Sequence, residues 1–212
     1  MNSSKKFTYP FFETLCVING HIQFPELHQQ RYQKTCRGFY GHDPSQDLLH
    51  GLTIPLSFQQ GHVKLKVWYN QSRREAEFSK YPYHPLHSLQ CVEAPLIDYP
   101  LKYSNRSALD ALVKHKGNCD DVLILQHGAV RDASYANICF WTGQHWVTPK
   151  KPLLQGTKRE HLLQTGQIHP TEITINDFSA FTHFKLINAM RNFTQDKPQP
   201  MHQILLPSAP HK

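Results

Sequence analysis

The segment Pro100-Leu101-Lys102-Tyr103-Ser104-Asn105-Arg106 is the part of this 212-residue chain around which the fold is best predicted. Apolar residues recur at helical spacing directly after it, so residues 106–116 are predicted to form a helix. A run of four aliphatic residues then predicts a strand over residues 121–126. The chain continues as Gly128-Ala129-Val130-Arg131-Asp132-Ala133-Ser134-Tyr135-Ala136-Asn137-Ile138, which places the acid Asp132 shortly after that strand. This order of helix and strand predicts a mixed α/β fold.

A second informative segment is Leu154-Gln155-Gly156-Thr157-Lys158-Arg159, which leads from a turn into a predicted helix at residues 157–165. The first amide groups of a helix have no partner within the helix, and the helix dipole favours negative charge there. A helix that opens on Gly-Thr is therefore suited to binding a phosphate. Together, Lys102, Asp132 and this turn are the groups needed to bind an aldehyde cofactor that carries a phosphate and a pyridine nitrogen.

The composition is that of an ordinary folded protein, with 18% charged and 39% hydrophobic residues. The length allows one large domain or two small ones. A net charge of +7 suggests a nucleic-acid partner at first, but the basic residues are scattered and form no run. We therefore expect no nucleic-acid binding, and a positive balance that suits a site for phosphate and carboxylate groups.

The cysteines and histidines give no sign of a metal site. The five cysteines form no Cys-x-x-Cys pair and are predicted to be buried free thiols: Cys16, Cys36, Cys91, Cys119 and Cys139. The fifteen histidines show no His-x-x-x-His on a clear helical face. Residues 1–10 resemble neither a signal peptide nor a membrane span, so we expect a cytoplasmic protein without a membrane segment.

The first part of the chain is predicted to form a small sheet with one or two helices. Asn19-Gly20 predicts a type I′ hairpin turn, because both residues tolerate positive φ, and Pro25-Glu26 predicts a helix start. The predicted strands are residues 11–18, 21–24, 63–69, 74–80 and 86–92, with a helix at 26–39 and a loop region at 40–60.

Prolines in the stretch 93–100 indicate a linker, which divides the chain into a domain at 1–94, a linker at 95–100 and a domain at 101–212. The further elements predicted for the second domain are strands at 136–141, 146–148, 172–175 and 184–187, and a short helix near Asp177.

The order of several short motifs resembles the class IV pyridoxal-phosphate enzymes, a family that includes branched-chain and D-amino-acid aminotransferases and 4-amino-4-deoxychorismate lyase. The matching segments run in the family's order and cover most of the chain: Phe12-Glu13-Thr14-Leu15, Asn19-Gly20, His28-x-x-Arg31, Leu101-Lys102, 128–137, Thr148-Pro149, 154–159 and Leu186-Ile187-Asn188-Ala189.

The resemblance implies that Lys102 forms the Schiff base with the cofactor aldehyde and moves protons at the substrate carbon. Asp132 stands where the family usually has glutamate, beside the pyridine nitrogen, and aspartate keeps the charge with one methylene less of reach. Arg31, Gly156 and Thr157 are implied to bind the cofactor phosphate, and Asn188 to replace a phosphate-binding hydroxyl. Residue by residue, the alternatives are a surface lysine, a turn cap at Asp132, a solvated Arg31, a simple turn at Gly156 and a strand-end cap at Asn188.

Cys16 stands where relatives frequently carry an arginine that is available to a substrate carboxylate. Tyr103, Arg106 and Lys158 are the alternatives for anion binding in this chain. Glu13 is not expected to be a catalytic acid.

The resemblance implies a two-domain fold of the D-amino-acid-aminotransferase type (fold type IV), with pyridoxal 5′-phosphate in the cleft between the domains, and a homodimer. It implies an enzyme for an amino-acid-type substrate. The first hypothesis is a 4-amino-4-deoxychorismate lyase, which gives 4-aminobenzoate and pyruvate for folate synthesis. The alternatives are a branched-chain or D-amino-acid aminotransferase, or a degenerate scaffold without catalysis.

Overall fold

The structure is a computed structural model that describes residues 8–207. Internal contacts divide these residues into two units, one formed by residues 8–83 and 101–105 and the other by residues 84–100 and 106–207. The division differs from the predicted boundaries because residues 84–94 belong to the second unit, whereas residues 101–105 return to the first. The predicted placement of a cofactor in a cleft between two domains stays a prediction.

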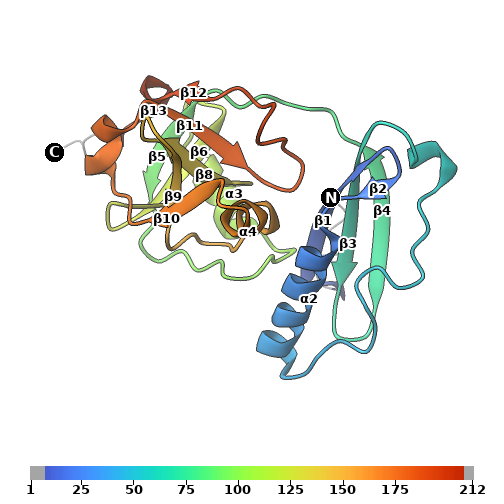
Figure 1. Ribbon diagram of the computed structural model, residues 1–212. Helices are drawn as coiled ribbons and strands as arrows, with labels where there is room; N and C mark the ends of the chain where they lie inside the picture. Colours follow the sequence, from blue (N-terminus) through green and yellow to red (C-terminus); the bar gives the residue numbers. More distant parts are fainter. Residues whose placement is uncertain (1–7, 208–212) are drawn as a thin grey trace. The chain divides into compact units, whose positions relative to one another are not determined.

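The first unit is an antiparallel sheet with a long helix against it (Figure 1). The strands lie in the order β2-β1-β3-β4, with the bounds Phe11–Ile18 (β1), His21–Ile22 (β2), His62–Tyr69 (β3) and Arg74–Lys80 (β4). The helix is α2 (Pro25–Tyr40), and a 3-10 turn, η1, covers Leu56–Phe58. The strands and the helix predicted for residues 11–39 and 63–80 are therefore confirmed, although β2 is shorter than predicted.

Alternation along β1 and β3 separates the two faces of this sheet. One face packs on Tyr32 and Cys36 of α2 and consists of Phe11, Leu15, Val17, Val63, Leu65, Val67 and Tyr69. The opposite face carries Phe12, Thr14, Cys16, Lys64, Lys66 and Trp68. The predicted hairpin turn is confirmed, since Asn19 and Gly20 have φ values of 48° and 80°.

The second unit contains two sheets, one in the order β13-β5-β6-β7 and one in the order β10-β9-β8-β11-β12 (Figure 1). The first sheet is formed by Leu89–Glu93 (β5), Asp121–Gln126 (β6), Ala129–Ala133 (β7) and Ile204–Leu205 (β13). The second is formed by Asn137–Trp141 (β8), Trp146–Pro149 (β9), Ile168–Thr171 (β10), His183–Ile187 (β11) and Gln199–Pro200 (β12).

Two short α-helices and two 3-10 helices complete this unit. They are α3 (Ser107–Val113), α4 (Thr157–Gln164), η2 (Ile175–Ala180) and η3 (Met201–Gln203). Aliphatic and aromatic residues of both sheets form one core, including Leu123, Leu125, Val130, Ile138, Phe140, Phe184 and Leu186. All five cysteines are buried free thiols, as predicted.

Two predicted strands are corrected, and one observed strand was not predicted. The strand predicted at residues 86–92 begins only at Leu89 and pairs in parallel with β6, so it belongs to the second unit. The strand predicted at 172–175 is wrong: the strand lies at Ile168–Thr171, where three of its four residues are exposed and no alternation marks it. Strand β7 was not predicted, and Asp132 therefore lies within a strand and not in a turn. Within residues 8–207, no helix is both long and apolar enough to cross a membrane.

Candidate functional site

Lys102 lies beside the start of β1, held there by backbone hydrogen bonds on both sides. Phe12 N donates to Lys102 O at 3.1 Å, and Ser104 N donates to Pro10 O at 2.7 Å. Tyr103 N donates to Leu101 O at 2.9 Å, so Lys102 is the central residue of a three-residue turn. Its Nζ lies 4.9 Å from the centroid of the Phe12 ring. The backbone thus fixes the origin of a half-buried amine, which is what a covalent attachment point requires.

Glu13 forms a buried ion pair in the same unit. Its carboxylate accepts a hydrogen bond from Arg31 Nε at 2.8 Å and contacts His28 Nδ1 at 2.7 Å. Complete burial opposes the ionisation of Glu13, but the Arg31 guanidinium and the His28 contact overcome it and lower the carboxyl pKa to about 2. Burial in turn lowers the pKa of His28. Glu13 is therefore ionised at neutral pH and is no proton donor, in agreement with the sequence analysis.

The ion pair with Glu13 fixes the position of the Arg31 side chain. Its side chain is 13% exposed and is held by Glu13, so Arg31 is not the solvated residue of the alternative interpretation. A guanidinium has five N–H groups. The bond to the Glu13 carboxylate fixes the plane of the Arg31 guanidinium and so orients its other N–H groups. His28 completes the arrangement from one turn earlier on α2. This role of His28 was not predicted, although its spacing of three from Arg31 places both residues on one helix face.

Asp132 is a buried carboxyl at the end of β7 in the second unit. Its Oδ1 accepts a hydrogen bond from Asn137 Nδ2 at 2.7 Å, and its Oδ2 accepts one from Leu154 N at 2.9 Å. Burial raises the pKa of Asp132 to about 7, against the opposing effect of the hydrogen bonds and of Arg159. These direct donors are neutral groups. A cationic N–H donor beside this carboxyl would stabilise its ionised form.

Asn137 links Asp132 to the loop that opens α4, and the sequence analysis missed it. Besides its bond to Asp132, Asn137 Nδ2 donates to Leu154 O at 2.9 Å. A Cβ built on Gly156 would overlap Asn137 Oδ1 and lie 3.2 Å from its Cγ. Gly156 is thus needed for the close approach of this asparagine, so it is more than a simple turn residue. The signal in the sequence was a polar residue at the start of an otherwise apolar strand.

We predict that Gly156→Ala destabilises the protein by about 1–3 kcal/mol, because the methyl group must displace Asn137 from Asp132 and Leu154. Gly38→Ala is the matched control: Gly38 lies in α2, and a Cβ there would have no atom within 4 Å. It should cost nothing and stabilise by up to about 1 kcal/mol. Urea unfolding of both variants measures the difference. Equal stability of the two variants would contradict the proposed close packing.

A further prediction concerns the pH dependence of stability. Because the folded-state pKa of Asp132 is raised from 3.8 to about 7, the folded state binds the proton more tightly than the unfolded state does. Its contribution to stability is therefore present at low pH and is lost as the pH rises through about 7. Unfolding of the cofactor-free protein and of Asp132→Asn is compared at pH 5 and pH 8. Relative to Asp132→Asn, the wild type should lose on the order of a few kcal/mol of unfolding free energy between pH 5 and pH 8. A difference between the two proteins that is the same at both pH values would contradict the raised pKa.

The first turn of α4 is the predicted phosphate-binding element. Gly156 is the N-cap residue, and the buried Thr157 opens the helix. Arg159 is 4% exposed; its Nη2 donates to Pro149 O at 2.9 Å and its Nη1 to Gln155 Oε1 at 3.1 Å. A buried guanidinium thus adds positive charge to the helix dipole at this end of α4. Arg159 belongs to the motif at residues 154–159, and its burial is not predictable from that motif.

Asn188 follows β11 and makes contacts within the second unit. Its Oδ1 accepts a hydrogen bond from Met190 N at 2.9 Å, and its Nδ2 donates to Tyr135 O at 3.3 Å. These bonds match the alternative of a strand-end cap. A role toward a phosphate stays a prediction.

Among the alternatives for anion binding, two residues have clear structural roles. The Arg106 guanidinium lies 4.0 Å from the centroid of the Tyr135 ring and donates to Ser134 O at 2.7 Å. Tyr103 packs against Phe11, with ring centroids 5.4 Å apart. Arg106 therefore serves to hold the segment between β7 and β8.

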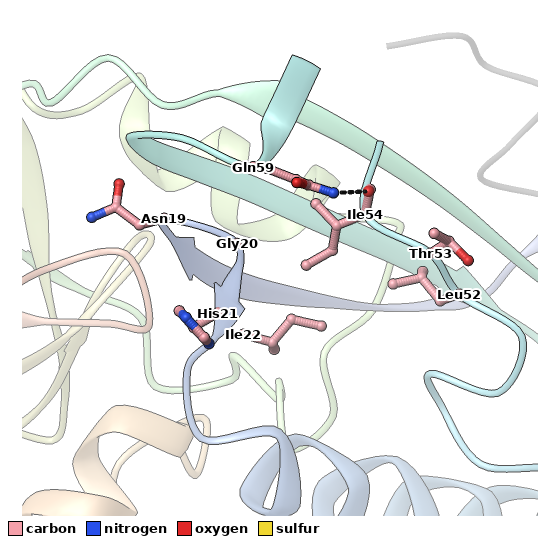
Figure 2. A pocket seen from close by; sticks show the side chains of 8 residues that line it. All are labelled: Asn19, Gly20, His21, Ile22, Leu52, Thr53, Ile54 and Gln59. Carbon is pink, nitrogen blue, oxygen red and sulfur yellow. Dashed lines mark hydrogen bonds between the residues drawn. The ribbon is translucent and has the colours of Figure 1, made fainter. Parts of the chain in front are cut away.

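A hollow of about 550 Å³ lies elsewhere in the first unit (Figure 2). Gln59 Nε2 donates to Ile54 O at 3.3 Å at its edge. Its lining residues are Asn19, Gly20, His21, Ile22, Leu52, Thr53, Ile54 and Gln59. None of the predicted site residues lines it. Across residues 8–207, no group of three or more His, Cys, Asp or Glu side chains is placed to hold a metal ion.

Comparison with known proteins identifies the class of protein. The family model described as "Amino-transferase class IV" matches residues 10–195, which is most of the chain. The chain therefore belongs to the class IV aminotransferase family. The family resemblance noted in the sequence is confirmed, and so is a mixed α/β fold of this family.

Individual relatives and solved structures are similar to most of this chain. The chain is 38% identical over 184 residues to an uncharacterized protein of Haemophilus influenzae, covering 86% of this chain and 98% of that protein. A Haemophilus somnus structure described as a "putative 4-amino-4-deoxychorismate lyase" is similar with a TM-score of 0.77 and 32% identity, over 87% of this chain and 98% of that one. A hypothetical aminotransferase from Mycobacterium tuberculosis, in a PLP-bound form, has a TM-score of 0.76 at 18% identity, over 95% of this chain and 84% of that one, and shows the shared fold alone.

Proposed function

We propose that this chain is a pyridoxal-phosphate-dependent enzyme. The observation that supports it is Asp132, a buried carboxyl with a pKa near 7, tied through Asn137 and Leu154 to the loop that opens α4. The residues present fit the cofactor: a protonated pyridine nitrogen is the cationic donor that would suit this carboxyl, and the start of α4 suits a phosphate. When bound, pyridoxal phosphate supplies an electron sink for the substrate carbon.

Each side chain would then have a defined task. Lys102 would attach the cofactor through its Nζ, and its amine would move a proton at the reacting substrate carbon. Asp132 would accept the hydrogen bond of the ring N–H and keep that proton in place. Thr157 and the amides at the start of α4 would hold the phosphate, and the Arg31 guanidinium, oriented by Glu13, would supply positive charge to it. Asn137 positions Asp132.

We propose further that the reaction is that of a 4-amino-4-deoxychorismate lyase, which releases pyruvate and leaves 4-aminobenzoate. The support is the 32% identity to the Haemophilus somnus protein so described, over nearly all of that chain. A 52-residue segment that is 44% identical to a "putative aminodeoxychorismate lyase" of Schizosaccharomyces pombe agrees with it. A homodimer in the cytoplasm is part of the proposal.

The test is incubation of the cofactor-loaded protein with 4-amino-4-deoxychorismate in the absence of any 2-oxo acid. We expect pyruvate and 4-aminobenzoate in equal amounts, and neither product from Lys102→Ala. Amino transfer that depends on a 2-oxo acid, with a branched-chain or D-amino acid as donor, would replace the lyase by the aminotransferase alternative. Absence of any cofactor absorption band after addition of pyridoxal phosphate would favour the degenerate scaffold and overturn the proposal.

A further inference from the structure

The face of the first sheet that points away from α2 carries a second lysine near Lys102. Lys66 Nζ lies 4.2 Å from the centroid of the Phe12 ring and 4.7 Å from that of Trp68. Lys102 Nζ lies 4.9 Å from the same Phe12 centroid. Because both amines are measured to one ring, they are no more than about 9 Å apart, which is within the range of a single small substrate. All four residues belong to one unit, so this separation does not depend on the other unit.

The surroundings of Lys66 make it a candidate anion ligand. Phe12 and Trp68 are 6% and 4% exposed, whereas Lys66 is half-buried, and its ammonium group lies against both rings. Glu77 is its cross-strand neighbour on β4 and is exposed. An ion pair at such an exposed position contributes little binding energy, so a substrate carboxylate can compete with Glu77 for Lys66.

We propose that Lys66 binds a carboxylate of the substrate whose amino group reacts at Lys102. This inference rests on the proposed function and specifies its substrate class. A charge-assisted hydrogen bond takes up roughly 3 Å of the separation between the two amines, so at most about 6 Å remains between the amino nitrogen and the carboxylate of the substrate. This upper limit admits an amine on a six-membered ring with a carboxylate on the opposite carbon.

The chain provides a matched control for this role. Lys64 lies two residues earlier on β3 and on the same face, where it pairs with Cys16. Cys16 Sγ lies 3.1 Å from His62 Nε2. Lys64 has the same charge as Lys66 and faces the same side. Comparing variants of the two lysines therefore separates the effect of positive charge on this face from the effect of the position of Lys66.

The experiment is isothermal titration calorimetry of cofactor-loaded protein with 4-aminobenzoate and, for comparison, with aniline, which lacks the carboxylate. Lys66→Gln should weaken 4-aminobenzoate binding by roughly 10- to 100-fold, the range expected for one charge-assisted hydrogen bond. Aniline binding should not change, Lys66→Arg should restore most of the affinity, and Lys64→Gln should have less than about a threefold effect. In turnover, Lys66→Gln should raise KM more than it lowers kcat.

Wild-type affinity in Lys66→Gln, an equal loss in Lys64→Gln, or no measurable binding of 4-aminobenzoate to the loaded wild type would overturn the inference. The absorption band of the cofactor bound at Lys102 is recorded in each sample. If that band is present while Lys66→Gln binds normally, only the inference fails. If the band is absent in the wild type, the proposed function fails with it.

Discussion

Lys102→Ala is expected to lower turnover by about a thousandfold or more, since no other group can replace the amine that attaches the cofactor. The fold should persist, because the bonds that fix this segment run through the backbone and include Phe12 N to Lys102 O. The measurements are turnover, the visible absorption band of cofactor-loaded protein, and urea unfolding. Lys114→Ala, at an exposed position beyond α3, is the control and should behave as wild type. An alanine variant that retains the absorption band would remove Lys102 from its assigned role.

The second large effect is on stability. Glu13→Gln should lower the free energy of unfolding by about 3–5 kcal/mol, because it removes the carboxylate that pairs with the half-buried Arg31 and the buried His28. Glu13 is 0% exposed. Urea unfolding at pH 7 measures the loss, and Glu26→Gln, at an exposed position in the first turn of α2, should cost less than about 1 kcal/mol.

The pH dependence of the same pair gives an independent check. The folded-state pKa of Glu13 is lowered from 4.5 to about 2, so its contribution is present above pH 4.5 and is lost as the pH falls through about 2. Glu13→Gln should lack this acid-induced loss. A variant as stable as the wild type at pH 7 would show that Glu13 is not held as a buried ion there.

The first half of the fold was largely predictable because its signals are local. Asn19-Gly20 requires positive φ, Pro25 starts α2, and β3 alternates. Strand β5 illustrates what such signals leave open. Its residues predicted a strand, but its partners β6 and β13 lie far along the chain, and pairing in parallel over such distances is not encoded within the strand itself.

Ordered motifs single out Lys102 and Thr157 from the sequence, and the roles assigned to them stay predictions. Contacts within the site were not predictable. The ion pair between Arg31 and Glu13 depends on the packing of α2 against β1. The close approach of Asn137 to Gly156 depends on the path of the loop between β9 and α4.

The attachment of the cofactor is tested most directly by reducing the pyridoxal-phosphate-loaded protein with borohydride and mapping the modified peptide by mass spectrometry. Borohydride converts a lysine–cofactor linkage into a stable pyridoxyl adduct, so the attached residue is identified without reference to any substrate. The account predicts one adduct per chain, on Lys102. An adduct on another lysine, such as Lys66, or no adduct in a protein that is folded by urea titration, would contradict it.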